Sequence, residues 1–222
     1  MIADLPGEGC LIAFDAEFVM VEHEEYLFTA SGSKRMLREA RNTLARMSII
    51  DCRTGKVIID DHVLPREPVV DYLTRFSGVL EEHLDPANSS HHLITPRNAY
   101  LKLRLLVERG CIFVGHGLSQ DFATVNIFVP PSQIIDTVEI FHQDKMRFIS
   151  LRFLVNYLLK RDMQQDVHDS IEDAKAAYEL YLEALKCKQN GTFDKVLRDI
   201  YEFGRKAEWR LGVEAQQHNQ HI

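Results

Sequence analysis

The sequence has few cysteines and no long hydrophobic run. Its four cysteines are Cys10, Cys52, Cys111 and Cys187. With no close pair among them, they argue against a disulfide framework and a cysteine-based zinc site, so we expect reduced thiols. No apolar run approaches the length of a membrane-spanning helix, and the N-terminus lacks a basic start followed by a hydrophobic block. These absences predict an intracellular soluble protein with no membrane partner.

The sequence also has no excess of positively charged residues. The formal net charge is −7, with 26 Lys and Arg residues against 33 Asp and Glu residues. This balance argues against a generic nucleic-acid binder held mainly by phosphate contacts. A divalent-metal site, however, carries its own acids and reverses the local charge when it is loaded. The charge therefore leaves a metal-dependent nucleic-acid enzyme open.

The first third of the chain is predicted to be rich in strands. Apolar stretches of strand length cover residues 11–20, 44–52 and 56–64, and the short turn 53–55 favours an antiparallel hairpin. Between the first two strands, residues 22–43 form a connection punctuated by Ser and Gly, with a basic end. The sequence does not determine its form.

The remainder alternates helices with short strands. Helices are expected at residues 67–76, 96–110, 118–128, 151–160, 171–189 and 192–211, and short strands at 111–117 and 134–137. Thr95 suits an N-cap and Pro96 the first helical position. These elements predict an α/β fold with a mixed sheet flanked by helices. We expect one domain over residues 9–211, an N-terminal segment 1–8 and a polar, disordered tail 212–222.

Two acids interrupt the first apolar strand, LIAFDAEFVM. Asp15 and Glu17 lie two residues apart, so their side chains share one face of the strand. Burying an unpaired carboxylate is costly, and an adjacent like charge adds to the cost. An Arg or Lys could compensate, or a divalent metal ion, for which carboxylate oxygens are natural ligands. The pattern is often solvated surface, but the apolar neighbours weaken that interpretation.

Two further acids and a histidine stand out, although each has an ordinary structural explanation. Asp121 follows a Gly-His-Gly turn and lies in the first turn of an expected helix, where an acid complements the helix dipole in any protein. His168 and Asp173 lie in the stretch VHDSIEDA. There Ser170 and Asp173 fit a capping-box spacing, and Asp169 could itself be an N-cap.

Together these residues resemble the DEDD exonuclease superfamily, in the subgroup with a histidine in its last motif (DEDDh). The signatures stand as Asp15-Ala16-Glu17, Asp121 within GHGLSQDF, and His168-Asp169-Ser170-Ile171-Glu172-Asp173. The stretches DDHVLPREPVVDYLTRFSG and RFISLRFLVNYLLKRDMQQDVHDSIEDAKAAYELY extend the likeness. They resemble the nuclease domain of the catalytic subunit of Pan-type poly(A)-nuclease deadenylases, from about Gly9 to Arg205.

The resemblance implies a ribonuclease-H-like fold and a 3′→5′ exoribonuclease that shortens mRNA poly(A) tails and releases 5′-AMP. It assigns Asp15, Glu17, Asp121 and Asp173 to two divalent metal ions, Mg²⁺ or else Mn²⁺. It assigns His168 to activation of the attacking water, a role that suits a side chain whose pKa lies near working pH.

The resemblance also implies a setting for the chain. The substrate would be single-stranded RNA, and the partners a pseudokinase adaptor subunit and poly(A)-binding protein. The protein would act in the cytoplasm. Location in processing bodies or in the nucleus stays an open alternative. The chain would be the C-terminal part of a polypeptide that also holds a propeller and a ubiquitin-hydrolase-like region.

Substrate contacts are harder to assign from residue types. Phe76, with Ser77 beside it, lies at an expected helix end and could stack on a terminal base. Phe18 is another candidate, but core packing is favoured because it lies on the opposite strand face from Glu17. The densest basic cluster, which could track phosphates or form a solvated face, is Lys34, Arg35, Arg38, Arg41 and Arg46. We interpret His91, His92 and Cys111 as incidental.

Two alternatives stay open. The first keeps the chemistry and changes the substrate, as in a Rex-type or other DEDDh exonuclease that acts on other RNA or on DNA. The second is a non-catalytic RNA-binding or scaffold module whose acids are structural. Because all four acids and the histidine are present, the motif itself argues against a degenerate copy.

Overall fold

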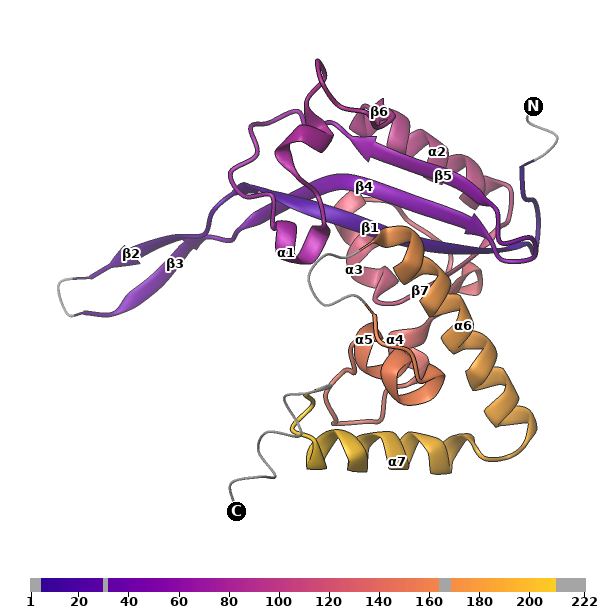
Figure 1. Ribbon diagram of the computed structural model, residues 1–222. Coiled ribbons are helices and arrows are strands. Elements are labelled where there is room, and N and C mark those ends of the chain that lie inside the picture. The colour runs from indigo at the N-terminus through magenta and orange to yellow at the C-terminus, as the bar shows by residue number, and fades with distance from the viewer. Residues whose placement is uncertain (1–4, 30–31, 164–168, 211–222) are drawn as a thin grey trace.

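A six-stranded mixed sheet forms the centre of the protein, in the order β6-β5-β4-β1-β7-β8 (Figure 1). The computed structural model describes residues 5–29, 32–163 and 169–210. The strands are β1 (Leu11–Glu22), β4 (Arg41–Asp51), β5 (Val57–Val63), β6 (Leu93–Ile94), β7 (Ile112–Gly115) and β8 (Ile134–Asp136). β4 pairs antiparallel with β1 and β5, whereas β6, β7 and β8 join in parallel. The expected mixed α/β sheet is confirmed.

Helices cover both faces of this sheet. They are α1 (Thr74–Ser77), η2 (Glu81–Leu84), α2 (Pro96–Glu108), α3 (Leu118–Val125), η3 (Pro131–Gln133), α4 (Thr137–Ile140), α5 (Leu151–Leu154), η4 (Val155–Leu159), α6 (Ser170–Gln189) and α7 (Phe193–Lys206). On one face, Leu103 and Leu106 of α2 join the main apolar core. On the other, Ala174 of α6 packs against Ala13 and Ile50. In the described part of the chain, no helix has the length and apolar character needed to cross a membrane.

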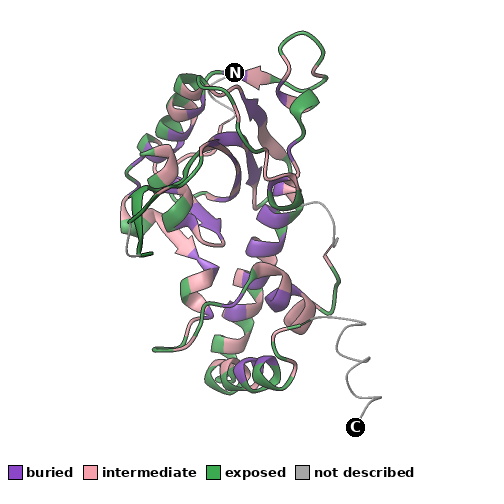
Figure 2. Cartoon of the chain, turned by 90° about the vertical axis from the view of Figure 1, so that its left-hand side faces the viewer, coloured by how far each residue is buried: buried purple, intermediate pink, exposed green. Residues whose placement is uncertain are grey.

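The strand that carries the two acids is fixed firmly in the core. Phe14 of β1 is 1% exposed, stacks on Phe122 of α3 at 5.6 Å and meets Phe113 of β7 edge-on at 6.1 Å. Buried residues accordingly gather in the central strands and on the inner sides of the helices (Figure 2). Packing of this density holds β1 in one register, so the positions of its acids are well defined.

The prediction of a helix at residues 67–76 is wrong. Instead, the backbone of Asp71 bridges Met20 of β1, with the N–H of Met20 donating to the carbonyl of Asp71 at 2.8 Å. Leu73 then adopts a positive φ of 50°, and only Thr74–Ser77 is helical. The apolar residues that suggested a helix, Val69 and Tyr72, pack beside Val19. Tertiary pairing with β1 therefore overrides the local pattern.

The connection at residues 22–43 contains a two-stranded arm, β2 (Glu25–Phe28) and β3 (Lys34–Arg38), that extends away from the sheet (Figure 1). All five residues of β3 are exposed, including the basic residues Lys34, Arg35 and Arg38. The arm therefore carries much of the basic cluster as a solvated face. The domain bounds at residues 9–211 stay a prediction, and the tail 212–222 lies outside the described residues.

Candidate active site

Three acids from two distant parts of the sequence converge on one face of the sheet. Carboxylate oxygens of Asp15 and Glu17 on β1 and Asp173 on α6 all lie within 4.8 Å of one another. Asp169 caps α6, because its side chain accepts a hydrogen bond from the N–H of Ile171 at 3.1 Å. Asp173, one turn later, therefore faces the sheet. The structure thus brings together three of the acids that the sequence singled out, and we refer to them as the carboxylate cluster.

A polar network fixes the start of α6 against the sheet. Arg46 of β4 donates from Nε to Oδ1 of Asp60 at 2.8 Å, and its Nη2 lies 3.1 Å from Oδ1 of Asp169. The hydroxyl of Ser48 hydrogen bonds both Ser170 and, at 3.1 Å, Asp60. With its side chain only 16% exposed, Arg46 is not part of the solvated basic face. It positions the helix that presents Asp173.

Burial disfavours the charged forms of Asp15 and Glu17. The pKa of Asp15 is raised well above its usual range, first by burial and then by the charges of Glu17 and Asp173. Burial, followed by the charge of Asp173, raises the pKa of Glu17 to about 9. Divalent cations favour carboxylate oxygens and would replace the protons that these groups otherwise retain. The donor set therefore fits a divalent metal ion.

Asp121 borders the cluster from the first turn of α3. Gly115 lets β7 approach β1 closely, because a Cβ at this position would lie 2.7 Å from the carbonyl oxygen of Phe14. Gly117, with φ of 89°, then turns the chain into the helix. Burial and the charge of Asp136 raise the pKa of Asp121 to about 7. Its own charge raises the pKa values of Asp15 and Glu17, so it acts electrostatically on the cluster.

Asp136 is a site residue that sequence reasoning missed. It ends β8, and its Oδ1 accepts hydrogen bonds from the N–H groups of Gly117 at 2.8 Å and Val138 at 3.0 Å. It therefore fixes the turn that leads to Asp121. The only available signal was an Asp followed by Thr at the end of an expected strand, which is a common N-cap pattern.

The remaining candidates differ in how the structure places them. The ring of Phe76 is 67% exposed at α1, whereas Phe18 packs against the core. Ser77 is 2% exposed, and its hydroxyl donates to the carbonyl of Tyr72 at 2.7 Å and accepts from Val79. Contacts of Phe76, Ser77 and Phe18 with a substrate stay predictions. His168 lies outside the described residues, and its role also stays a prediction.

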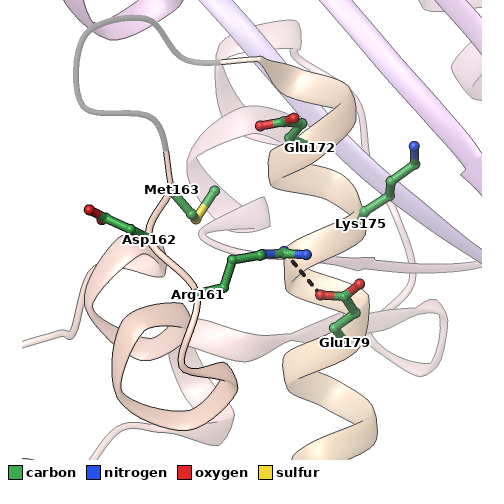
Figure 3. Close-up of a pocket in the computed structure, with 6 residues that line it drawn as sticks. All are labelled: Arg161, Asp162, Met163, Glu172, Lys175 and Glu179. Carbon is green, nitrogen blue, oxygen red and sulfur yellow. Dashed lines mark ion pairs between the residues drawn. The ribbon is translucent and has the colours of Figure 1, made fainter.

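A separate pocket of about 290 Å³ lies along α6 (Figure 3). Its lining is Arg161, Asp162, Met163, Glu172, Lys175 and Glu179. Arg161 reaches across to Glu179 in an ion pair of 3.0 Å. Glu172 lines this pocket, whereas Asp173 belongs to the carboxylate cluster, because successive helical residues point about 100° apart. The pocket is therefore distinct from the candidate active site.

Acids brought together from a strand and a helix on a mixed sheet are typical of metal-dependent nucleases. The comparison with protein families agrees with this class. The sequence model of the exonuclease family (RNase_T) matches residues 12–181, and the chain belongs to this family. Membership implies dependence on divalent metal ions, in agreement with the acidic donor set.

Relatives in the comparison are catalytic subunits named for deadenylation. The chain is 48% identical over 210 residues to the PAN2-PAN3 deadenylation complex catalytic subunit PAN2 of Cryptococcus neoformans var. neoformans serotype D, covering 91% of this chain and 18% of that protein. Identity to the Homo sapiens subunit is 43% over 218 residues, covering 95% and 18%. The chain thus spans about a fifth of the length of these relatives.

Solved structures confirm the fold. The pseudoubiquitin hydrolase-RNA exonuclease module of Saccharomyces cerevisiae Pan2, in complex with AACCAA RNA, superposes with a TM-score of 0.86 at 41% identity, covering 96% of this chain and 35% of that one. The Pan2 catalytic unit of Neurospora crassa gives a TM-score of 0.77 at 42% identity, covering 89% and 30%. The expected resemblance to Pan-type nuclease domains is confirmed.

Proposed function

We propose that the chain is the exonuclease part of a poly(A)-nuclease catalytic subunit, which removes nucleotides from the 3′ end of mRNA poly(A) tails as 5′-AMP. The observation that carries the proposal is the convergence of Asp15, Glu17 and Asp173 within 4.8 Å. Membership in the exonuclease family and identity of 43–48% to deadenylation subunits support it.

In this proposal Asp15, Glu17, Asp121 and Asp173 hold two Mg²⁺ ions, or Mn²⁺ in their place. When bound, two such ions supply Lewis-acid activation of water and stabilisation of the leaving 3′ oxygen. The protein contributes a buried, pre-positioned donor set, because Glu17 is 7% and Asp173 6% exposed. His168 accepts the proton of the attacking water in this scheme, as the motif implies.

The setting of the reaction is proposed from the relatives. They are named as catalytic subunits of PAN2-PAN3 deadenylation complexes, and solved Pan2 modules hold RNA. We infer that this chain acts on single-stranded poly(A) in the cytoplasm, together with a pseudokinase adaptor and poly(A)-binding protein. Copurification of such an adaptor with the chain, expressed as part of its full polypeptide, tests this assignment.

The test of the activity is product analysis on a 5′-labelled, A-tailed RNA. With Mg²⁺ we expect stepwise shortening and release of AMP, lost in EDTA and in Asp173→Asn. The matched control is Asp194→Asn, which makes the same change at an exposed position on α7. Equal rates on oligo(A), oligo(U) and oligo(dA) would contradict poly(A) specificity and favour another DEDDh substrate. A folded protein that releases no AMP with Mg²⁺ or Mn²⁺ would favour a scaffold module.

A further inference from the structure

Three histidines form a second cluster, away from the carboxylates. They are His62 on β5, His83 in η2 and His91 in the loop before β6, and one nitrogen from each lies within 4.8 Å of the others. The ring centroids of His62 and His91 are 4.0 Å apart, and those of His83 and His91 are 4.7 Å apart. We refer to these residues as the histidine cluster.

The most buried of these side chains has an unsatisfied nitrogen. His62 is 2% exposed, and its Nδ1 has no hydrogen-bond partner among the described residues. Buried polar atoms in folded proteins are nearly always paired, so an unpaired one calls for a ligand or another specific explanation. The neighbouring His92 does not supply a partner, because its Nδ1 lies 2.6 Å from Oδ1 of Asp61.

The protonation state of the three histidines decides which kind of ligand fits the cluster. Burial, and next the proximity of His91, lowers the pKa of His62 to about 4. The same two causes lower the pKa of His83. Arg46 further favours the neutral form of His62, and Asp60 opposes it. Neutral imidazoles bind transition metals, whereas attraction of a phosphate would require charged ones.

We propose that His62, His83 and His91 bind a Zn²⁺ ion at a site separate from the carboxylate cluster. Imidazole nitrogens suit Zn²⁺, whereas Mg²⁺ prefers oxygen ligands, so the two clusters select different metals. The ion would join η2 and the following loop to β5. Binding requires the stacked rings of His62 and His91 to turn so that their nitrogens converge on the ion. It also breaks one hydrogen bond, which Nδ1 of His83 accepts from the N–H of Leu80 at 3.2 Å. This bond is lost when Nδ1 binds the metal or carries the proton.

The sheet register places the new site beside the candidate active site. Glu17 pairs with Arg46, and Arg46 pairs with His62, so all three side chains share one face. Two strand spacings separate Glu17 from His62, about 10 Å. The histidine cluster and the carboxylate cluster thus lie on the same face of the sheet but form two separate sites.

The test is calorimetric titration of the 222-residue chain with Zn²⁺ while Mg²⁺ saturates the carboxylate cluster. We expect one Zn²⁺ per chain, with affinity reduced at least tenfold in His83→Asn and in His91→Asn. Asn at position 83 keeps an acceptor for the N–H of Leu80, and His91 is exposed, so both variants should fold. The matched control, His23→Asn at an exposed position, should bind as the parent does.

Two results would overturn the proposal. One is an absence of Zn²⁺ binding in Mg²⁺, or binding that both variants leave unchanged. The other is loss of the Zn²⁺ site in Asp15→Asn, which would place the ion in the carboxylate cluster. Imidazole proton NMR gives an independent readout, because resonances of all three histidines should shift with one equivalent of Zn²⁺. Neither measurement depends on nuclease activity.

Discussion

The carboxylate cluster and the histidine cluster occupy one face of the same sheet and respond to burial in opposite ways. Burial raises the pKa of Glu17 to about 9 and lowers the pKa of His62 to about 4. In both cases the neutral form is favoured, because removal from water penalises charge of either sign. In the carboxylate cluster a bound cation would offset the cost of ionisation, whereas in the histidine cluster the neutral imidazoles already offer lone pairs to a metal ion, so the donor atoms select different cations.

Arg46 lies between the two clusters and affects both. Its charge lowers the pKa values of Asp15 and Glu17, so it favours their ionised forms. The same charge lowers the pKa of His62, so it favours the neutral imidazole. One guanidinium thus favours the unprotonated forms of carboxylates and imidazoles alike.

Removal of one carboxylate should have the largest effect. In Asp15→Asn we expect the rate of AMP release to fall by about 10³-fold or more, a barrier increase of about 4 kcal/mol. In EDTA the same variant should be more stable by about 1–2 kcal/mol, because repulsion from Glu17 and Asp173 is relieved. Thermal unfolding by circular dichroism checks the second effect. Retained turnover, or a lower melting temperature than that of Asp194→Asn, would contradict the metal assignment.

His116, which belongs to neither cluster, should contribute a loss of stability in acid. Burial lowers its pKa to about 4, and its Nε2 lies 3.1 Å from the carbonyl oxygen of Ile149. The unfolded chain binds the proton near pH 6.5, so stability present above that pH is lost as pH falls toward 4, by about 3 kcal/mol. The pH dependence of the His116 imidazole resonances measures this contribution separately from that of Asp15, Glu17 and Asp121, whose raised pKa values act in the opposite direction. His116 resonances that titrate near pH 6.5 in the folded protein would contradict this explanation.

Much of the fold could be predicted because its signals are local. The apolar runs at residues 11–20, 44–52 and 56–64 and the short turn between the last two specify antiparallel strands. The segment 67–76 could not be predicted in the same way. Its helical pattern competes with backbone pairing between Asp71 and Met20, which depends on the finished sheet.

The candidate site shows the same division. Asp15, Glu17 and Asp173 could be found because the motif spacing is visible in the sequence, and the structure brings them together. The role of Arg46 could not be found, because it depends on strand register and on the position of α6. His91 looked incidental for a similar reason, since its neighbours His62 and His83 meet it only after the loop folds back.

Zn²⁺ should stabilise the protein through the histidine cluster alone. At ten times its dissociation constant, with Mg²⁺ saturating, the ion should add about 1.4 kcal/mol to the free energy of unfolding. For a chain of this length the melting temperature should rise by about 3–6 °C. The rise should fall to about a third or less in His91→Asn at the same Zn²⁺ concentration and persist in full in His23→Asn. An equal rise in both variants would mean that Zn²⁺ stabilises the fold from another site.

Replacement of Phe76 should have the smallest effect of these changes, and the effect should be on substrate affinity. Its ring is 67% exposed on α1, which packs against β1, whereas η2 in the same connection packs against β5. If the ring stacks on a terminal base, Phe76→Ala should raise KM for oligo(A) about fivefold, a loss of about 1 kcal/mol, with little change in kcat. The matched control is Phe128→Ala, whose ring is 72% exposed. An equal change in both variants would remove Phe76 from the substrate path.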